Sequence, residues 1–378
     1  MAMAKRFLLV TEEWAGSGHR MAAEALQEVL LESEGARSAR VVGGLKTASP
    51  GLRVLSHFFY RNMLRYGQPV WQRIYEQEEM LGSALTKALG WWLSARLTNQ
   101  LLQEEKPDVV IATHAYCLSA LAEAKKRVSK PFQLVCVPTD FHINRFWVHP
   151  EIDAYMVAHE QIAQILIERY GIAPEKIHVY GIPVRPAFTT ALHTDKAAWK
   201  KQLGLVPDQF TVLIGGGEGG YGGVEQVVRE LLLEEQPLQI VVVTGKNTSL
   251  YRRLAGLLGT ESTDHRFILK GFEPQMWQWI GAADVYITKP GGISCAESLA
   301  LKTPLILFHP LPGQEKHNCS FLLEQQAAIL AETPVNIKEI IRSWRQPEKR
   351  DAFVGCMDKL GRPEAAHRIA HALLQLTD

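Results

Sequence analysis

The sequence lacks any long apolar run. No stretch approaches the roughly 20 uninterrupted apolar residues that a membrane-spanning helix needs. The apolar run near the amino end, residues 6–11, is too short to act as a signal peptide. We therefore expect the protein to lie in the cytoplasm and to touch membranes only peripherally.

Paired cysteines are also lacking. The five cysteines are an odd number and form no CxxC pair, which argues against a disulfide framework and against a thiolate zinc site. His142, His149 and His159 lie near one another in the sequence, but they form no helical i, i+4 pair and no cysteine supports them. We reject a metal site on these grounds and expect no cofactor.

Excess charge of either sign is nearly absent, since the formal net charge is +1 at pH 7. No global field therefore favours a nucleic-acid partner. Internal repeats and low-complexity segments are not visible either. The chain has 378 residues, 47% of them hydrophobic and 21% charged, which is typical of a soluble globular protein with two domains.

Short apolar runs alternate with helical patterns along both halves of the chain. Residues 6–11, 107–113 and 132–137 read as buried strands in the first half, and residues 210–214 and 239–244 do so in the second. This alternation favours βαβ units with right-handed crossovers. The expected fold class is α/β, with two doubly wound, Rossmann-like domains.

The boundary between the domains is expected where prolines interrupt the pattern. Residues 179–188, VYGIPVRPAF, combine a glycine with two prolines, which stiffen a crossover and mark the start of a linker. We predict a first domain over residues 1–190, a second over 191–360, and a terminal helix within 361–378.

A glycine turn in the second half has the features of an anion site. Gly291 and Gly292 permit a tight turn, Ser294 stands where a helix would begin, and we predict that helix over residues 295–301. Its unsatisfied N–H groups and partial positive charge favour a phosphate. Glu297, one turn in, can accept hydrogen bonds from a ligand hydroxyl pair. The alternative is an ordinary turn between a strand and a helix.

A polar loop follows the next predicted strand. Gln314 and Glu315 come after the apolar residues 305–308, hence at the carboxyl end of a strand, where open α/β sheets bind ligands. An amide and a carboxylate suit a polyol. With the glycine turn they indicate a nucleotide-sugar site, against the alternative of a simple surface loop.

The order TKPGG, a helix bearing Glu297, then PGQEK closely resembles glycosyltransferase family 28, and within it the diacylglycerol glycosyltransferase group. That resemblance implies the GT-B fold, in which two Rossmann-like domains face each other across a cleft and a terminal helix packs back on the first. It implies an inverting enzyme that moves a hexose from UDP-glucose or UDP-galactose to 1,2-diacylglycerol, forming a β-glycoside without a metal. Glucose is favoured, although Gln314 and Glu315 can bond either C4 epimer.

The resemblance also extends to the loops around the donor. The glycine-rich residues 215–223 are expected near the diphosphate; they lack the GK[ST] of a P-loop, and the alternative is a flexible hairpin. The nucleobase is expected at residues 270–272. The predicted donor-binding residues are Gly18, Gly217, Lys246, Asn247, Gly271, Phe272, Gly291, Gly292, Ile293, Ser294, Glu297, Gln314 and Glu315.

A histidine opens a predicted helix near the amino end. The GSGH sequence at residues 16–19 lacks the GxGxxG spacing of a dinucleotide fingerprint but resembles the N-terminal motif of the family, in which the histidine activates the acceptor. Imidazole titrates near neutrality, so it can take a proton from an alcohol. We predict His19 as the base, with Asp140 either orienting it or replacing it. An exposed turn histidine is the alternative.

Aromatic residues mix with arginines between residues 52 and 102. Such a mixture suits the surface of a membrane with anionic lipids, although the same rings can simply pack helices together. We predict Phe58 and Tyr60, together with Trp147, as acceptor-binding residues. Attachment to the inner face of the cell membrane is expected.

Three other functions stay open. The peptidoglycan lipid-linked N-acetylglucosaminyl transferase and UDP-N-acetylglucosamine 2-epimerase share the expected architecture, and a non-catalytic lipid- or nucleotide-binding module is the third. Dependence on lipid vesicles separates the epimerase from the transferases, and release of UDP with diacylglycerol separates an enzyme from a binding module.

Overall fold

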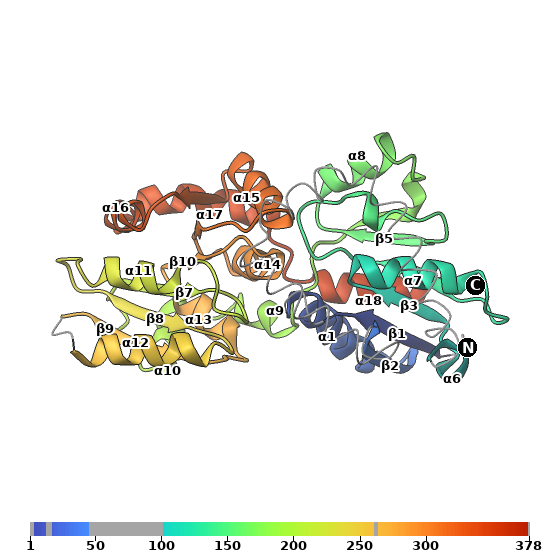
Figure 1. The fold of residues 1–378 in the computed structure, drawn as a ribbon, viewed down its shortest axis with the longest axis horizontal. Coiled ribbons are helices and arrows are strands. Elements are labelled where there is room, and N and C mark those ends of the chain that lie inside the picture. The colour runs from blue at the N-terminus through green and yellow to red at the C-terminus, as the bar shows by residue number, and fades with distance from the viewer. Residues whose placement is uncertain (1–3, 13–16, 45–100, 261–263, 377–378) are drawn as a thin grey trace. The chain divides into compact units, whose positions relative to one another are not determined.

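Two compact units make up the chain in a computed structural model, which describes residues 4–12, 17–44, 101–260 and 264–376 (Figure 1). The N-terminal unit comprises Met1–Pro186 and Glu364–Asp378, and the C-terminal unit is Ala187–Pro363. The chain thus passes from the first unit to the second within the proline-rich linker. The predicted acceptor residues Phe58 and Tyr60 lie outside the described residues.

The N-terminal unit is built on a sheet of six parallel strands in the order β2-β1-β3-β4-β5-β6. The strands are β1 (Lys5–Thr11), β2 (Ala36–Gly43), β3 (Val109–Ala112), β4 (Gln133–Cys136), β5 (Ala154–Val157) and β6 (Ile177–Val179). The inner strands are buried on both faces, and this explains their unbroken apolar runs. The edge strands β2 and β6 are half-exposed, so they carry no such run, and the sequence pattern does not predict them.

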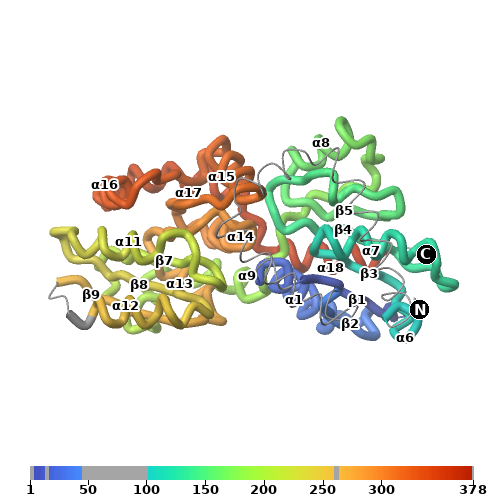
Figure 2. Tube along the Cα trace, viewed as in Figure 1, coloured from blue at the N-terminus to red at the C-terminus, as the bar shows by residue number. Residues whose placement is uncertain are grey.

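Helices cover the faces of this sheet. They are α1 (Gly18–Leu31), α6 (Gln103–Glu105), α7 (Ala115–Lys125), α8 (Glu160–Glu168) and α18 (Ala365–Gln375), with 3-10 turns η2 (Arg145–Trp147) and η3 (Pro174–Lys176). The last helix, α18, packs beside α1, and the two share one hydrophobic core over β1, β3 and β4 (Figure 2). The carboxyl end of the chain therefore belongs to the N-terminal unit.

The C-terminal unit repeats the plan with the strand order β12-β11-β10-β7-β8-β9, again all parallel. The strands are β7 (Thr211–Gly215), β8 (Gln239–Val243), β9 (Arg266–Lys270), β10 (Val285–Thr288), β11 (Leu305–Phe308) and β12 (Ala328–Ala331). The order reverses between β7 and β10 here, and between β1 and β3 in the other unit. Ligands of open parallel sheets bind at the carboxyl ends of such strands.

The helices of the C-terminal unit begin at the linker. They are α9 (Ala187–Ala191), α10 (Lys196–Gln202), α11 (Val224–Leu231), α12 (Thr248–Thr260), α13 (Met276–Ala282), α14 (Gly292–Ala300), α15 (Gln314–Glu324), α16 (Pro334–Trp344) and α17 (Pro347–Leu360). Three of them, α11, α12 and α16, bury their apolar faces in one core against the central strands. The starts of α10 and α16 are fixed by side-chain caps from Asp195 and Thr333.

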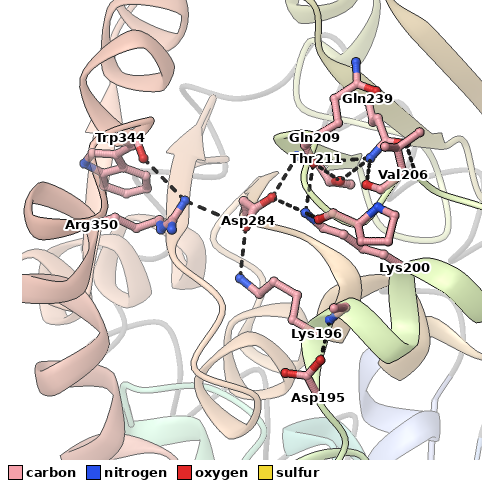
Figure 3. A network of polar contacts seen from close by, with 12 residues as sticks. Asp195, Lys196, Lys200, Val206, Gln209, Thr211, Gln239, Asp284, Trp344 and Arg350 are labelled. Atoms are coloured by element: carbon pink, nitrogen blue, oxygen red, sulfur yellow. Dashed lines mark hydrogen bonds and ion pairs between the residues drawn. The ribbon is translucent and has the colours of Figure 1, made fainter.

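A buried carboxylate ties two helices to the amino ends of β7 and β10 (Figure 3). Asp284 accepts hydrogen bonds from Lys200 Nζ at 2.7 Å and from the main-chain N–H of Thr211 at 2.9 Å. Lys196 and Arg350 pair with its other oxygen at 3.2 and 3.7 Å. Burial alone would raise the pKa of Asp284, but these lysines hold it below the ordinary value.

We predict that Asp284→Ala lowers the free energy of unfolding of the C-terminal unit by about 3–5 kcal/mol, because it leaves buried Lys200 without a counter-charge. Asp358→Ala, which breaks an exposed ion pair with Lys302, is the control and is expected to cost about 0–1 kcal/mol. Urea unfolding read by hydrogen exchange of β7 and β10 measures both. Equal stability of the two variants would contradict the assignment.

The same carboxylate predicts a pH dependence. The pKa of Asp284 is lower in the folded than in the unfolded chain, so its stabilisation is complete above the unfolded pKa. It is then lost as the pH falls through the depressed folded pKa. Stability of the C-terminal unit should therefore fall less steeply with acid in Asp284→Ala than in the wild-type chain.

Candidate functional site

His19 lies at the switch point of the N-terminal sheet, in the first turn of α1, the helix that follows β1. Its buried ring places Nδ1 2.8 Å from the main-chain carbonyl of Thr113 and 2.7 Å from the hydroxyl of Thr139. A carbonyl can only accept a hydrogen bond, so Nδ1 must donate and carry the proton. In the neutral ring, Nε2 then holds the lone pair.

The surroundings of His19 favour this neutral form. Burial lowers the pKa of the imidazole, the Asp140 carboxylate and the hydrogen bond with the carbonyl of Thr113 raise it, and the net shift is downward. His114 contacts the ring edge-to-face at 4.6 Å between centroids, and burial with His19 nearby holds its own pKa well below the usual value. At neutral pH, His19 is therefore a proton acceptor.

Three strand ends supply the supports of this histidine. Thr113 follows β3, Thr139 and Asp140 follow β4, and all three side chains are buried. The hydroxyl of Thr113 lies 2.8 Å from the hydroxyl of Thr11, at the end of β1, and 2.9 Å from the main-chain carbonyl of His19. The fold thus gathers His19 and Asp140, the two residues predicted for the base, and it adds three threonines, Thr11, Thr113 and Thr139.

Trp147 belongs to the short turn η2, which packs on α7, and its ring is buried. The neighbouring histidines have separate partners. His149 Nε2 lies 2.9 Å from the hydroxyl of Ser119, and His159 Nε2 donates to the carbonyl of Phe141 at 2.9 Å. Across residues 4–12, 17–44, 101–260 and 264–376, no group of three His, Cys, Asp or Glu side chains is placed to hold a metal ion.

In the C-terminal unit, α14 begins earlier than the sequence predicts. The expected start at Cys295 is wrong: the helix begins at Gly292, with Gly291 as an extended N-cap, and the N–H of Cys295 already bonds to the carbonyl of Gly291 at 3.0 Å. The N–H groups of Gly292, Ile293 and Ser294 therefore form the open first turn. Glu297 lies in the second turn, and its side chain is buried.

The sequence analysis predicts a loop at Gln314 and Glu315, and this is wrong: both residues lie in the first turn of α15. Gly313 forms its N-cap with φ of +94° and ψ of −132°, a conformation open to glycine that lets the chain turn sharply out of the preceding loop. The carboxylate of Glu315 accepts a hydrogen bond from the N–H of Leu311 at 3.0 Å. The amide of Asn318 donates to the carbonyl of Pro290 at 3.1 Å, which links α15 to the turn before α14.

The glycine-rich loop after β7 is folded tightly on itself and on the turn after β8. A Cβ on Gly216 would lie 2.1 Å from the carbonyl oxygen of Tyr221, and one on Gly245 would lie 2.3 Å from that of Glu218. The main-chain N–H of Lys246 donates to the main-chain carbonyl of Glu218 at 2.7 Å, and the side-chain amide of Asn247 donates to the carbonyl of Gly219 at 3.1 Å. Much of the glycine content thus serves the contact between these two loops.

Several predicted donor residues gather at the ends of β8 and β9. Lys246 pairs with Glu218, and its ammonium lies 5.5 Å from the ring centroid of Phe272. Phe272 is 54% exposed, and it follows Gly271 directly after β9. Gly217, with φ of +66°, lies at the end of β7 in the neighbouring loop.

Lys289, which the sequence analysis did not select, lies between these loops and the two helix starts. It follows β10 directly and forms an ion pair with Glu315. A Cβ on Gly217 would lie 3.4 Å from its Cε, and one on Gly291 would lie 3.4 Å from its Nζ. The lysine of the TKPGG motif could have pointed to this residue. Its partner Glu315, however, lies 26 residues further along the chain, so the sequence does not show the ion pair.

Residues 19–184 match the family described as Monogalactosyldiacylglycerol (MGDG) synthase, and residues 211–352 match the Glycosyltransferase family 28 C-terminal domain. A protein of Bacillus licheniformis named "Processive diacylglycerol beta-glucosyltransferase" is 30% identical over 349 residues, covering 92% of this chain and 88% of the relative. One of the same name from Bacillus subtilis is 29% identical, covering 90% and 86%.

Solved structures resemble the chain in fold. MurG of Acinetobacter baumannii gives a TM-score of 0.62 at 14% identity, covering 98% of this chain and all of that one. The UDP-GlcNAc 2-epimerase of Neisseria meningitidis, bound to UDP-GlcNAc, gives 0.59 at 16% identity, with the same coverage. These likenesses establish the doubly wound, two-domain architecture that the sequence predicts. In the part of the chain that the structure describes, no helix is both long and apolar enough to cross a bilayer.

We predict that Gly245→Ala disrupts the loop contact, because φ is +60° and the added Cβ would meet the carbonyl of Glu218. The expected cost is at least about 1–2 kcal/mol of stability, with faster hydrogen exchange over residues 216–221. Gly256→Ala, in α12, is the control: nothing lies within 4 Å of the added Cβ, and a slight gain of about 0.5–1 kcal/mol is expected. Wild-type exchange in Gly245→Ala would refute the prediction.

Proposed function

This chain belongs to the diacylglycerol glycosyltransferase group of glycosyltransferase family 28, and from that membership we propose that it moves glucose from UDP-glucose to 1,2-diacylglycerol. It is a UDP-sugar-dependent glycosyltransferase. The observation that carries the proposal is the similarity to diacylglycerol glucosyltransferases along most of the length of both chains. Glucose is preferred to galactose because those relatives are named for glucose.

The other functions that the sequence leaves open are not favoured. MurG and the epimerase resemble this chain at 14% and 16% identity, which reflects a shared fold and nothing about the substrate. A buried histidine at a helix start, held in one tautomer, favours an enzyme over a non-catalytic binding module.

The N-terminal unit supplies the base in this proposal. Nε2 of His19 takes the proton of the glycerol hydroxyl while that oxygen bonds to the anomeric carbon of the sugar, and the bond to the UDP oxygen breaks with its electron pair. Asp140 stabilises the imidazolium that forms, since its charge favours the protonated ring. Attack opposite the leaving group inverts the anomeric carbon and gives a β-glycoside.

The C-terminal unit binds the donor. The open first turn of α14 at Gly292–Ser294 receives the diphosphate, Glu297 accepts the ribose hydroxyls, and the nucleobase lies at Gly271 and Phe272. N–H groups at a helix start can stabilise the departing UDP, so the chemistry requires no divalent ion.

We also propose peripheral attachment to the inner face of the cell membrane. It is supported by the aromatic and arginine-rich composition of residues 52–102, which suits anionic lipid headgroups. Transfer of sugar to diacylglycerol should therefore be faster on vesicles with anionic lipid than on neutral ones.

The direct test is incubation with labelled UDP-glucose or UDP-galactose over diacylglycerol vesicles, followed by chromatography of the lipids. The expected product is a glucosyl diacylglycerol, with less label from UDP-galactose. Label confined to free sugar or to an epimerised nucleotide would overturn the proposal.

We predict that His19→Ala lowers turnover by about 10²–10⁴, the range for a positioned general base, while UDP binding persists. Asp140→Asn separates the two candidates for the base. If Asp140 supports His19, the variant keeps measurable turnover, and the acid limb of its pH profile moves to lower pH, because the histidine pKa falls without the carboxylate. A turnover loss in Asp140→Asn as large as in His19→Ala would make Asp140 the base.

Glu297→Ala and the milder Glu297→Gln are expected to weaken UDP binding about 10- to 100-fold by removing charge-assisted hydrogen bonds to the ribose. Calorimetric titration with UDP measures the change, and titration with a 2′,3′-dideoxy analogue is the control, since the variants should bind it as the wild type does. Wild-type affinity for UDP in both variants would undo the ribose assignment.

A further inference from the structure

Lys289 follows β10 and lies beside the starts of α14 and α15. Its stem passes three glycines: a Cβ on Gly217, Gly222 or Gly291 would lie 3.4, 3.3 and 3.4 Å from its Cε, Cβ and Nζ. The last contact places the ammonium beside the N-cap of α14. The ion pair with Glu315 places it beside the first turn of α15 as well.

Two helix starts and an ammonium therefore share one small region. Each helix start carries a partial positive charge, which favours anions and disfavours cations. Gly291 and Gly313 are the N-caps, and neither helix start receives a side-chain cap among the described residues. Glu315 is the carboxylate that balances the lysine, and it also accepts the N–H of Leu311. Both helix starts thus add partial positive charge beside the ion pair of Lys289 and Glu315.

We propose that Lys289 is the cation that binds the donor diphosphate and that Glu315 holds it in place until the donor arrives. On binding, the ammonium exchanges the carboxylate for the phosphate oxygens, and the released carboxylate accepts hydrogen bonds from the sugar. This inference rests on the proposed function, since it assumes a UDP-sugar as the ligand.

The exchange gives Lys289 a part in the transfer step. The acceptor oxygen bonds to the anomeric carbon, the bond from that carbon to the β-phosphate oxygen breaks, and the electron pair stays on UDP. The negative charge on that oxygen grows as the bond breaks, so an ammonium beside it stabilises the transition state more than the bound donor. The hydroxyl proton goes to His19.

A second lysine–glutamate pair in the same unit offers a matched control. Lys338 on α16 pairs with Glu230 on α11, with side chains 17% and 16% exposed, against 19% and 14% for Lys289 and Glu315. Both pairs are half-buried, but Lys338 lies within helix α16, whereas Lys289 lies at the carboxyl end of strand β10. Removing either lysine breaks an ion pair of similar burial. A difference in ligand binding between the two variants is therefore due to where the lysine lies in the unit.

The first experiment compares calorimetric affinities for UDP and uridine in the wild-type chain, Lys289→Met and Lys338→Met. Lys289→Met should lose about 10- to 100-fold in UDP affinity and nothing in uridine affinity, the loss expected for a charge-assisted contact to phosphate. Lys338→Met should change neither, and Lys289→Arg should keep most of the preference for UDP. Wild-type UDP affinity in Lys289→Met would overturn the proposal.

Glu315→Gln tests the exchange of partners. Its amide no longer competes for the ammonium, so UDP should bind as well as in the wild type or several-fold tighter. The KM for UDP-glucose should rise, because the uncharged amide oxygen accepts hydrogen bonds from the sugar less strongly than the carboxylate does. A loss of UDP affinity equal to that of Lys289→Met would mean a fixed structural pair, and the proposal would be wrong.

Failure of the proposed function has a different signature. A wild-type chain that binds UDP through Lys289 but transfers no sugar to diacylglycerol would refute the acceptor and leave the lysine assignment standing. A wild-type chain that binds UDP no better than uridine would refute both.

Discussion

The parallel pairing of strands is the constraint on which both units depend. Parallel strands need crossovers, and a strand order that reverses leaves the carboxyl ends of two neighbouring strands, together with the following helix starts, without a covering connection. In the N-terminal unit these ends are those of β1 and β3, with His19 in the first turn of α1. In the C-terminal unit they are those of β7 and β10, with the glycine loop and Lys289. One topological rule thus leaves an uncovered carboxyl edge of the sheet in each unit.

The electrostatic environments at these two carboxyl edges differ. Around His19, burial lowers the pKa of the imidazole and favours the uncharged ring, and the carbonyl of Thr113 fixes which nitrogen carries the proton. Around Lys289, two helix starts add partial positive charge beside the ion pair with Glu315. The first arrangement suits an acceptor of protons and the second a binder of anions, and a sugar transfer from a nucleotide needs both.

Charge placed at the other end of the same sheet has a structural purpose. Asp284 precedes β10 at its amino end and gathers Lys200, Lys196 and Arg350 from two helices (Figure 3). Because these groups bond mainly to one another and to main-chain atoms, they stabilise the packing of α10 and α17. The glycines also have two different structural roles. Gly216 and Gly245 allow two loops to come into contact. The absence of a side chain at Gly217, Gly222 and Gly291 leaves room for the side chain of Lys289.

Sequence alone determined the fold class, the family and most inner strands, because apolar runs such as 305–308 and motifs such as TKPGG are local patterns. The placement of Phe272 and Glu297 as donor residues remains a prediction. Only the tertiary structure decided that α14 starts at Gly292, that Glu315 lies in a helix, and that half-exposed segments form the edge strands β2 and β6. Likewise, Lys289 meets a carboxylate 26 residues away and His19 meets Thr139 across 120 residues. Such contacts depend on how the connections between strands fold back on the sheet. A local sequence pattern does not show which distant residues this brings together.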